Sequence, residues 1–233
     1  KDIFGGFFFA IILHFKILFL PAVVYFLLRG KIRLILSIII SFLILSFMPA
    51  YALGLSKVIS LFKAWLGILS YSIPSQVLNI KNQSLVYAIS SILPLPRKEN
   101  IIYLAGTVLM ALSFLAIARL AGLSQKDRRV PSKYLEIGLL IIAILVFSPI
   151  SWTTYFINLI IPLGIAASFY FTNGRRMFIS AALIIYFVLS CLVGTDITDA
   201  IPGMNNARFA NIAIGAILLG ICLYASHISR RID

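Results

Sequence analysis

Long apolar runs occupy most of this chain and leave it few ways to fold. Seven of them follow one another between charged or Gly- and Pro-rich points, near 4–28, 34–54, 101–122, 135–150, 153–173, 177–194 and 209–227. A stretch of about 20 apolar residues matches the thickness of a bilayer rather than the length of a strand or a core helix. Because lipid offers the backbone no hydrogen bonds, such runs must be helices or parts of a closed barrel. The sequence predicts an all-α integral membrane protein of about seven transmembrane helices, forming a single transmembrane domain over 1–233.

The composition indicates lipid rather than water as the solvent of this chain. Of its 233 residues, 61% are hydrophobic and 12% are charged, and its mean hydropathy is +1.06. A soluble globular domain usually carries about 25% charged residues. A chain with so few charges has too little polar surface to be a water-soluble globule.

The basic residues orient the predicted spans. Lys and Arg follow the first, third, fifth and seventh runs, whereas 148–152 has no charge and 195–207 has two aspartates and no Lys or Arg. Since cytoplasmic loops collect Lys and Arg, the first run is predicted to start on the outer side. We therefore expect the C-terminal part of a larger protein, with an odd number of spans before Lys1. The alternative is a full protein numbered from its mature end.

The net charge of +13 does not predict a nucleic-acid partner. Twelve of the twenty Lys and Arg residues fall on the predicted cytoplasmic side, where orientation and anionic headgroups account for them. Membrane lipids are the partners that this charge distribution predicts.

One long segment, 55–100, is neither a span nor a short loop. Within 56–71, polar or small residues recur at helical spacing among apolar ones, which predicts an amphipathic helix in the membrane interface. Pro74 is expected to end this helix, and a second short helix is expected over 85–93. Because loops of this length are often functional, we interpret 55–100 as an extracytoplasmic loop with an interfacial helix.

Lys16 stands near the middle of the first run. It lies about twelve residues from either end, roughly 18 Å of helix, so its ammonium cannot easily reach a headgroup layer. An ionisable group at that depth indicates a functional site. An anionic ligand such as a lipid phosphate would neutralise it; a wet cavity or a carboxylate elsewhere in the protein is the alternative. His14 lies on a different face and is expected to be a satisfied core histidine rather than a ligand.

Two short polar motifs lie on the predicted outer side. Asn82-Gln83-Ser84 offers two amides and a hydroxyl able to hydrogen-bond sugar hydroxyls; the alternative is a polar cap with Ser84 at the N-cap of the next helix. The segment 148–152 lies at the outer end of a predicted tight hairpin, where Ser-Pro favours a turn and tryptophan an interfacial anchor. Asp196 and Asp199 could supply a general base, or could simply be solvated.

Three segments of the chain, taken together, resemble a known enzyme family. They are Phe15-Lys16-Ile17 through Leu28-Arg29-Gly30-Lys31, Asn82-Gln83-Ser84-Leu85, and Ser148-Pro149-Ile150-Ser151-Trp152. Their order and spacing are similar to the C-terminal half of polyprenyl-phosphate-dependent glycosyltransferases of family 87, a bacterial mannosyltransferase-like group with a GT-C architecture. The resemblance covers most of 1–173.

The resemblance implies a hexosyltransferase of the bacterial inner (plasma) membrane. Such an enzyme takes a sugar, here expected to be mannose, from a polyprenyl-phosphate donor and attaches it to a lipid or glycan acceptor on the extracytoplasmic side. A carboxylate base would activate the acceptor hydroxyl, and the carrier phosphate would leave; no metal or cofactor is implied. The substrate-binding residues would be Lys16 near the phosphate, with the sugar site shaped or lined by Asn82, Gln83, Ser84, Ser151, Trp152 and Tyr155.

The chain departs from this family in two places. Thr153, Thr154 and Tyr155 follow Trp152, where the family often has an acid or histidines. The catalytic aspartate of GT-C enzymes lies in the first outer loop near the N-terminus, and no stretch of 1–233 matches it, so the base stays unassigned. The other functions considered are a transporter subunit, which would carry carboxylates in its spans, and a non-catalytic membrane scaffold. No Asp or Glu stands in the middle of any predicted span.

Overall fold

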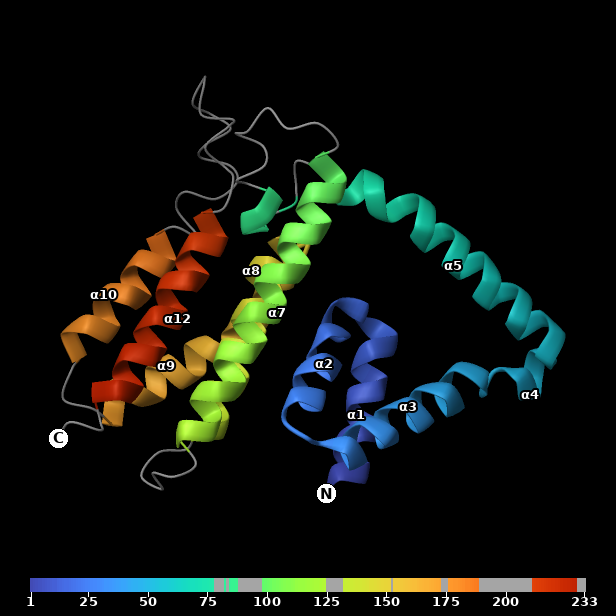
Figure 1. Ribbon diagram of the computed structural model, residues 1–233, viewed down its shortest axis with the longest axis horizontal. Helices are drawn as coiled ribbons and strands as arrows, with labels where there is room; N and C mark the ends of the chain where they lie inside the picture. Colours follow the sequence, from blue (N-terminus) through green and yellow to red (C-terminus); the bar gives the residue numbers. More distant parts are fainter. Residues whose placement is uncertain are drawn as a thin grey trace. The chain divides into compact units, whose positions relative to one another are not determined.

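The part of the chain that the structure describes is helical. The computed structural model describes residues 1–77, 82, 84–87, 98–124, 132–151, 153–172, 176–188 and 211–229. About 90% of them are helical and none lies in a strand, which confirms an all-α fold for these residues. They belong to two compact units, Lys1–Gln76 and Val77–Asp233, each of which is described by itself (Figure 1).

Two helical segments are long and apolar enough to cross a membrane. They are Ile32–Leu53 and Asn100–Leu120, and shorter apolar helices cover Asp2–Phe15, Ile17–Leu28 and Tyr155–Ser168. Length and composition thus bear out helices of transmembrane character, while the count of seven spans stays a prediction.

The first apolar run is a helical hairpin and not one straight helix. It consists of α1 (Asp2–Phe15), a 3-10 turn η1 (Ile17–Phe19) and α2 (Pro21–Leu28), and the chain reverses between α1 and α2 (Figure 1). The ring centroids of Phe9 and Phe26 lie 5.4 Å apart. In a continuous helix the 17 residues between them would cover about 26 Å. The prediction of a single span over 4–28 is therefore wrong.

Pro21 gives the physical reason for this reversal. A proline inside a helix has no N–H to donate, and its ring clashes with the carbonyl four residues earlier. At the first position of a helix both costs vanish, and Pro21 is the first residue of α2. The backbone at Lys16 is extended, with φ −144° and ψ 92°, so α1 has already ended before the proline is reached.

A glycine turn leads from α2 into α3 (Ile32–Phe47). The N–H of Gly30 donates to Leu27 O and that of Lys31 donates to Phe26 O, which is the paired pattern of a Schellman cap. Gly30 has φ 65°, a left-handed conformation that costs glycine little. The helix α3 is followed by the short α4 (Ala50–Leu53).

The helices α1 and α3 pack closely and run in the same direction. Ser37 Oγ donates a 2.9 Å hydrogen bond to the carbonyl oxygen of Ile3, and a Cβ added to Gly6 would lie 2.5 Å from Ser37 Cβ. At the other end of α1, His14 Nε2 lies 3.0 Å from Ser46 Oγ, and the His14 ring lies 4.3 Å from that of Phe42. Small residues that let helix backbones approach are typical of helix packing in membranes.

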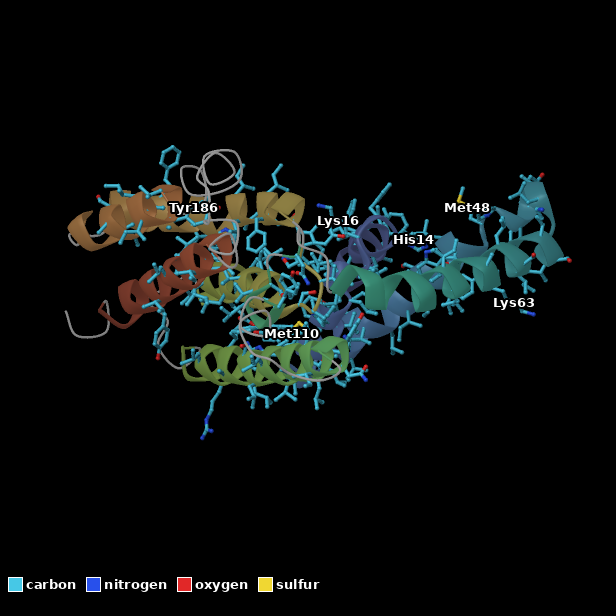
Figure 2. The ribbon with its side chains drawn as sticks, turned by 90° about the horizontal axis from the view of Figure 1, so that it is seen from above. His14, Lys16, Met48, Lys63, Met110 and Tyr186 are labelled. Atoms are coloured by element: carbon cyan, nitrogen blue, oxygen red, sulfur yellow. The ribbon has the colours of Figure 1, made fainter. Side chains whose placement is uncertain are left out.

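The amphipathic helix α5 (Leu55–Val77) follows Gly54, whose φ is 79°. Between 55 and 68 every side chain except that of Val58 is exposed, including Phe62 and Trp65, whose rings lie 5.4 Å apart. Lys63 projects outward from it (Figure 2). The prediction that Pro74 ends this helix is wrong, because α5 continues to Val77. The proline comes in the last turn, where a kink disturbs few of the helix's hydrogen bonds.

The second unit is a bundle around α8 (Ser132–Phe147). The helix α8 contacts α7 (Lys98–Ser124), α9 (Ile160–Thr172) and α12 (Asn211–Ser229), and α12 also contacts α10 (Arg176–Phe187). Residues 140–146 of α8 are all buried. A 3-10 segment η2 (Thr153–Leu159) joins α8 to α9, and both contact α8, which confirms the predicted hairpin at 148–152.

Candidate functional site

The side chain of Asn82 joins two polar segments that lie far apart in the sequence. Its Nδ2 donates a 2.7 Å hydrogen bond to Pro149 O. Its Oδ1 accepts one from Ser151 N–H at 2.9 Å and one from Ser84 N–H at 3.1 Å. The amide thus joins its own segment to the turn between α8 and η2. We call this hydrogen-bonded junction, which consists of residues 82, 84–87 and 148–151, the Asn82 knot.

Asn82 is fully buried in this knot, with 0% of its surface exposed. The sequence predicts this amide at the outer surface, where sugar hydroxyls could reach it. The structure instead commits the amide to backbone groups, because a buried loop must satisfy its polar atoms from within the protein. Asn82 therefore shapes the knot from inside.

Ser84 opens a new helical turn. Its Oγ accepts a 3.1 Å hydrogen bond from the N–H of Tyr87, three residues on, which is the geometry of an N-cap. Ser84 is also fully buried. Of the two interpretations of this residue, the helix cap is therefore the one that the structure shows. Residues 85–87 are helical, and the remainder of the short helix predicted over 85–93 lies outside the described residues.

An apolar cluster backs the knot. Val86, Tyr87 and Ile102 are buried together, with Leu109 of α7 and Ile150 of the turn packed against them. Burial raises the pKa of the Tyr87 hydroxyl above its ordinary value, so this side chain stays neutral at physiological pH. The cluster anchors the start of α7 to both polar segments.

Gly106 permits the close approach of α7 to the end of α8. A Cβ at this position would lie 2.7 Å from the carbonyl oxygen of Phe147 and 3.5 Å from Pro149 Cγ. Sequence reasoning did not single out Gly106. A lone glycine inside a long apolar run was the only available signal, and such a glycine often has a packing reason.

Ser151 carries the one polar side-chain atom of the described residues that is buried without a hydrogen-bond partner. Ser151 is 0% exposed, and its Oγ has no partner there although its N–H is bound to Asn82. Leaving a buried hydroxyl unpaired costs about 1–3 kcal/mol. Such an atom in a native structure calls for an explanation, and a bound water, a bound ion or a catalytic role is one.

The other predicted site residues are not all placed with the knot. Tyr155 lies in η2, partly exposed, and its carbonyl accepts a 2.6 Å hydrogen bond from Asn158 Nδ2. Gln83 and Trp152 lie outside the described residues, as do Asp196 and Asp199. Lys16 belongs to the first unit, and Asn82, Ser84, Ser151 and Tyr155 belong to the second.

Lys16 lies at the tip of the α1–α2 hairpin and not in the middle of a helix. Its N–H caps α1 by donating to Ile12 O at 2.7 Å, and its side chain is partly exposed. Figure 2 shows the side chains of Lys16 and His14 projecting to different sides. The two ring nitrogens of His14 lie 2.8 Å from Ala10 O and 3.0 Å from Ser46 Oγ, so His14 is satisfied, as expected, although it is exposed.

Comparison with other proteins does not assign the chain to a family. No protein-family model matches the chain, and no curated protein and no solved structure is significantly similar to it. Among the described residues, no group of three or more His, Cys, Asp or Glu side chains could hold a metal ion.

Proposed function

We propose that this chain is part of a membrane glycosyltransferase that moves a sugar, with mannose as the first candidate, from a polyprenyl-phosphate donor to a lipid or glycan acceptor. The membrane is the bacterial plasma membrane, and the seven apolar runs lie in it. Transfer takes place on the extracytoplasmic side. No cofactor takes part, because the donor already carries the leaving group.

One observation carries the proposal. Two of the three segments on which the family resemblance rests lie next to each other, since Asn82 bonds to Pro149 and Ser151 across 67 and 69 residues. The spacing of the two segments in the sequence gives no reason to expect that they lie next to each other. Their meeting supports a common role for them in one site.

The residues of the Asn82 knot have different roles in this proposal. Asn82 and Ser84 fix the backbone of the two segments, because their polar atoms are already bound within the protein. The Ser151 Oγ is buried but has no protein partner, so it is the atom that a sugar hydroxyl would satisfy once binding opens the segment around it. Gln83 and Trp152 border these residues in sequence, and Tyr155 follows four residues after Ser151. The family resemblance adds these three to the sugar site and, separately, assigns Lys16 of the first unit to the donor phosphate. The base that activates the acceptor stays unassigned.

The test is transfer of labelled mannose from polyprenyl-phosphate mannose by membranes that contain the whole protein. Ser151→Ala is the sharpest variant, because removing an unpaired buried hydroxyl leaves no protein group without its partner. We expect a loss of transfer of tenfold or more, with thermal stability unchanged or raised because the unpaired hydroxyl is removed. Lys63→Ala, on α5, is the matched control and should transfer normally.

Two results would overturn the proposal. The first is no transfer by the whole protein from several polyprenyl-phosphate sugars. The second is full transfer by Ser151→Ala and by Tyr155→Phe alike, which would place the reaction away from the knot. In the first case the transporter subunit and the scaffold become the functions to examine.

A further inference from the structure

We propose that α1 and α2 form a re-entrant hairpin that enters and leaves the membrane on the side of the basic turn 29–33 and carries Lys16 towards the opposite face. This inference rests on the membrane embedding proposed above and not on sugar transfer. It moves the start of α1 from the outer side, where we had placed it from charge alternation, to the basic side.

The direction in which α1 and α3 pack carries the argument. Ile3 and Gly6, near the start of α1, lie against Ser37 in the first half of α3. His14, near the end of α1, lies against Phe42 and Ser46 in the second half of α3. Two consecutive spans joined by a short turn would run in opposite directions. Packing in the same direction instead puts the starts of α1 and α3 on one side of the membrane.

The lengths of the helices agree with a hairpin. The 14 residues of α1 and the 8 of α2 extend over about 21 Å and 12 Å at the α-helical rise, and the hydrocarbon core is about 30 Å thick. Neither arm is long enough to cross. The segment Ile32–Leu53 has 22 residues, or about 33 Å, and is long enough.

The charges agree as well. If 4–28 were a single span, Lys1 would lie opposite Arg29, Lys31 and Arg33. A re-entrant hairpin brings all four cations to one side, which is the distribution that cytoplasmic segments show. Asp2, in the first turn of α1, lies where the helix dipole favours a negative charge.

The hairpin also changes the depth of Lys16. Its tip lies beside Ser46, through the contact of His14 with that residue, and Ser46 precedes Leu53, the end of the crossing segment, by about 10 Å of helix. A lysine stem can extend along apolar surface to bring its ammonium towards water. Lys16 then lies within snorkelling reach of the face from which α5 begins, rather than at the centre of the bilayer.

Intrachain cross-linking tests the hairpin directly. In the full chain with Cys191 and Cys222 replaced by Ser, the double variant Phe9→Cys/Phe26→Cys should be joined by a short bifunctional thiol reagent, because the two phenyl rings lie 5.4 Å apart whereas a direct disulfide needs the backbones closer still. Trypsin cleaves after Lys16, so mass spectrometry would find the two peptides joined. The matched control is Leu104→Cys/Ala121→Cys, with the same separation inside the continuous helix α7, where about 26 Å prevents a bond. A first pair as unreactive as this control would overturn the hairpin.

Labelling from the two sides of the membrane tests its orientation and does not depend on the double variant. Single variants Asp2→Cys, Lys31→Cys and Tyr51→Cys would be treated with an impermeant maleimide in right-side-out and inside-out vesicles. Asp2→Cys and Lys31→Cys should react from one side, and Tyr51→Cys from the other. Reaction of Asp2→Cys from the side of Tyr51→Cys would overturn the proposal.

These outcomes stay separate from those of the transfer assay. A labelled hairpin without sugar transfer would leave the inference intact and remove the glycosyltransferase. Extraction of the protein from membranes by alkaline carbonate would overturn the membrane embedding, and the re-entrant hairpin with it.

Discussion

The amide oxygen of Asn82 accepts a 2.9 Å hydrogen bond from the backbone N–H of Ser151, 69 residues further along the chain. Together with the bond from Nδ2 to Pro149 O, it makes one side chain responsible for the meeting of a loop and a helical turn. Asparagine suits this task because its amide offers a donor and an acceptor at once. Aspartate offers acceptors alone at neutral pH, and alanine offers neither.

Asn82→Ala is expected to destabilise the second unit strongly. The change leaves the N–H groups of Ser84 and Ser151 and the carbonyl of Pro149 without their partner, at about 1–3 kcal/mol for each buried group. A total near 3 kcal/mol lowers the melting temperature of a chain of this size by about 10 °C, which a thermal scan in detergent would measure. Ser113→Ala is the control, because Ser113 Oγ bonds only to Leu109 O of its own helix, and its melting temperature should stay within about 2 °C.

Asn82→Asp separates hydrogen bonding from shape. The carboxylate has nearly the same volume and still accepts from the N–H of Ser84 and Ser151, but it cannot donate to Pro149 and adds a buried charge. It should therefore lose as much stability as Asn82→Ala. A melting temperature equal to that of the unmodified protein in both variants would show that the knot does not hold the unit together.

Ser84→Ala is expected to cost about 1 kcal/mol through loss of the N-cap bond to Tyr87 N–H, whereas Ser84→Gly should cost only a few tenths. Glycine is the matched variant because it removes the same hydroxyl while suiting the N-cap backbone. Denaturation in detergent would compare the two. Equal losses would mean that the hydroxyl acts elsewhere than at the helix start.

Gly106→Ala should lower stability by about 1–3 kcal/mol, the usual cost of forcing an extra methyl group into a packed site. The new Cβ would meet the carbonyl oxygen of Phe147, which is backbone and cannot rotate away. Gly164→Ala in α9 is the control, since nothing lies within 4 Å of its Cβ position, and it should stabilise by up to about 1 kcal/mol through helix propensity. Melting temperatures that move in the same direction would contradict this account of the α7–α8 contact.

Gly6→Ala tests the contact of α1 with α3. Its Cβ would lie 2.5 Å from Ser37 Cβ and 2.9 Å from the backbone nitrogen of Ile38, so the two helices must separate. Hydrogen exchange of the α1 amides should become faster. The neighbouring Gly5→Ala meets only Leu34 Cδ1, at 3.4 Å, and should leave exchange unchanged. Equal protection in both variants would argue against the close packing.

Much of the helical pattern could be predicted because apolar runs and charged breaks report directly on helices in lipid. The run 101–122 corresponds to α7, 135–150 to α8 and 209–227 to α12, each shifted by two or three residues at its ends. The prediction of one span over the first run failed because hydropathy counts apolar residues and does not report whether the chain reverses its direction. Pro21 was the available signal for a reversal, and Pro74, which does not end α5, shows why a proline alone does not decide.

The site was harder to predict than the helices. Asn82 and Ser151 were singled out as polar residues on one side of the chain, but nothing in their spacing states that one would bond to the other. Sequence reasoning read the Asn82 amide as an open hydrogen-bonding group, because polarity suggests exposure. Burial reverses that inference, since a polar group inside the protein is bound by the protein first.

The same-direction packing of α1 against α3 has a consequence for biogenesis. A segment leaves the ribosome before everything that follows it, so 1–28 emerges while Ser37, Phe42 and Ser46 are still inside the exit tunnel. The surface that α1 packs against therefore becomes available only after the turn at Gly30 and most of α3 have emerged. The helix α1 can therefore pack only after α3 has followed it. A translocon that releases helices strictly in order would release α1 without its neighbour.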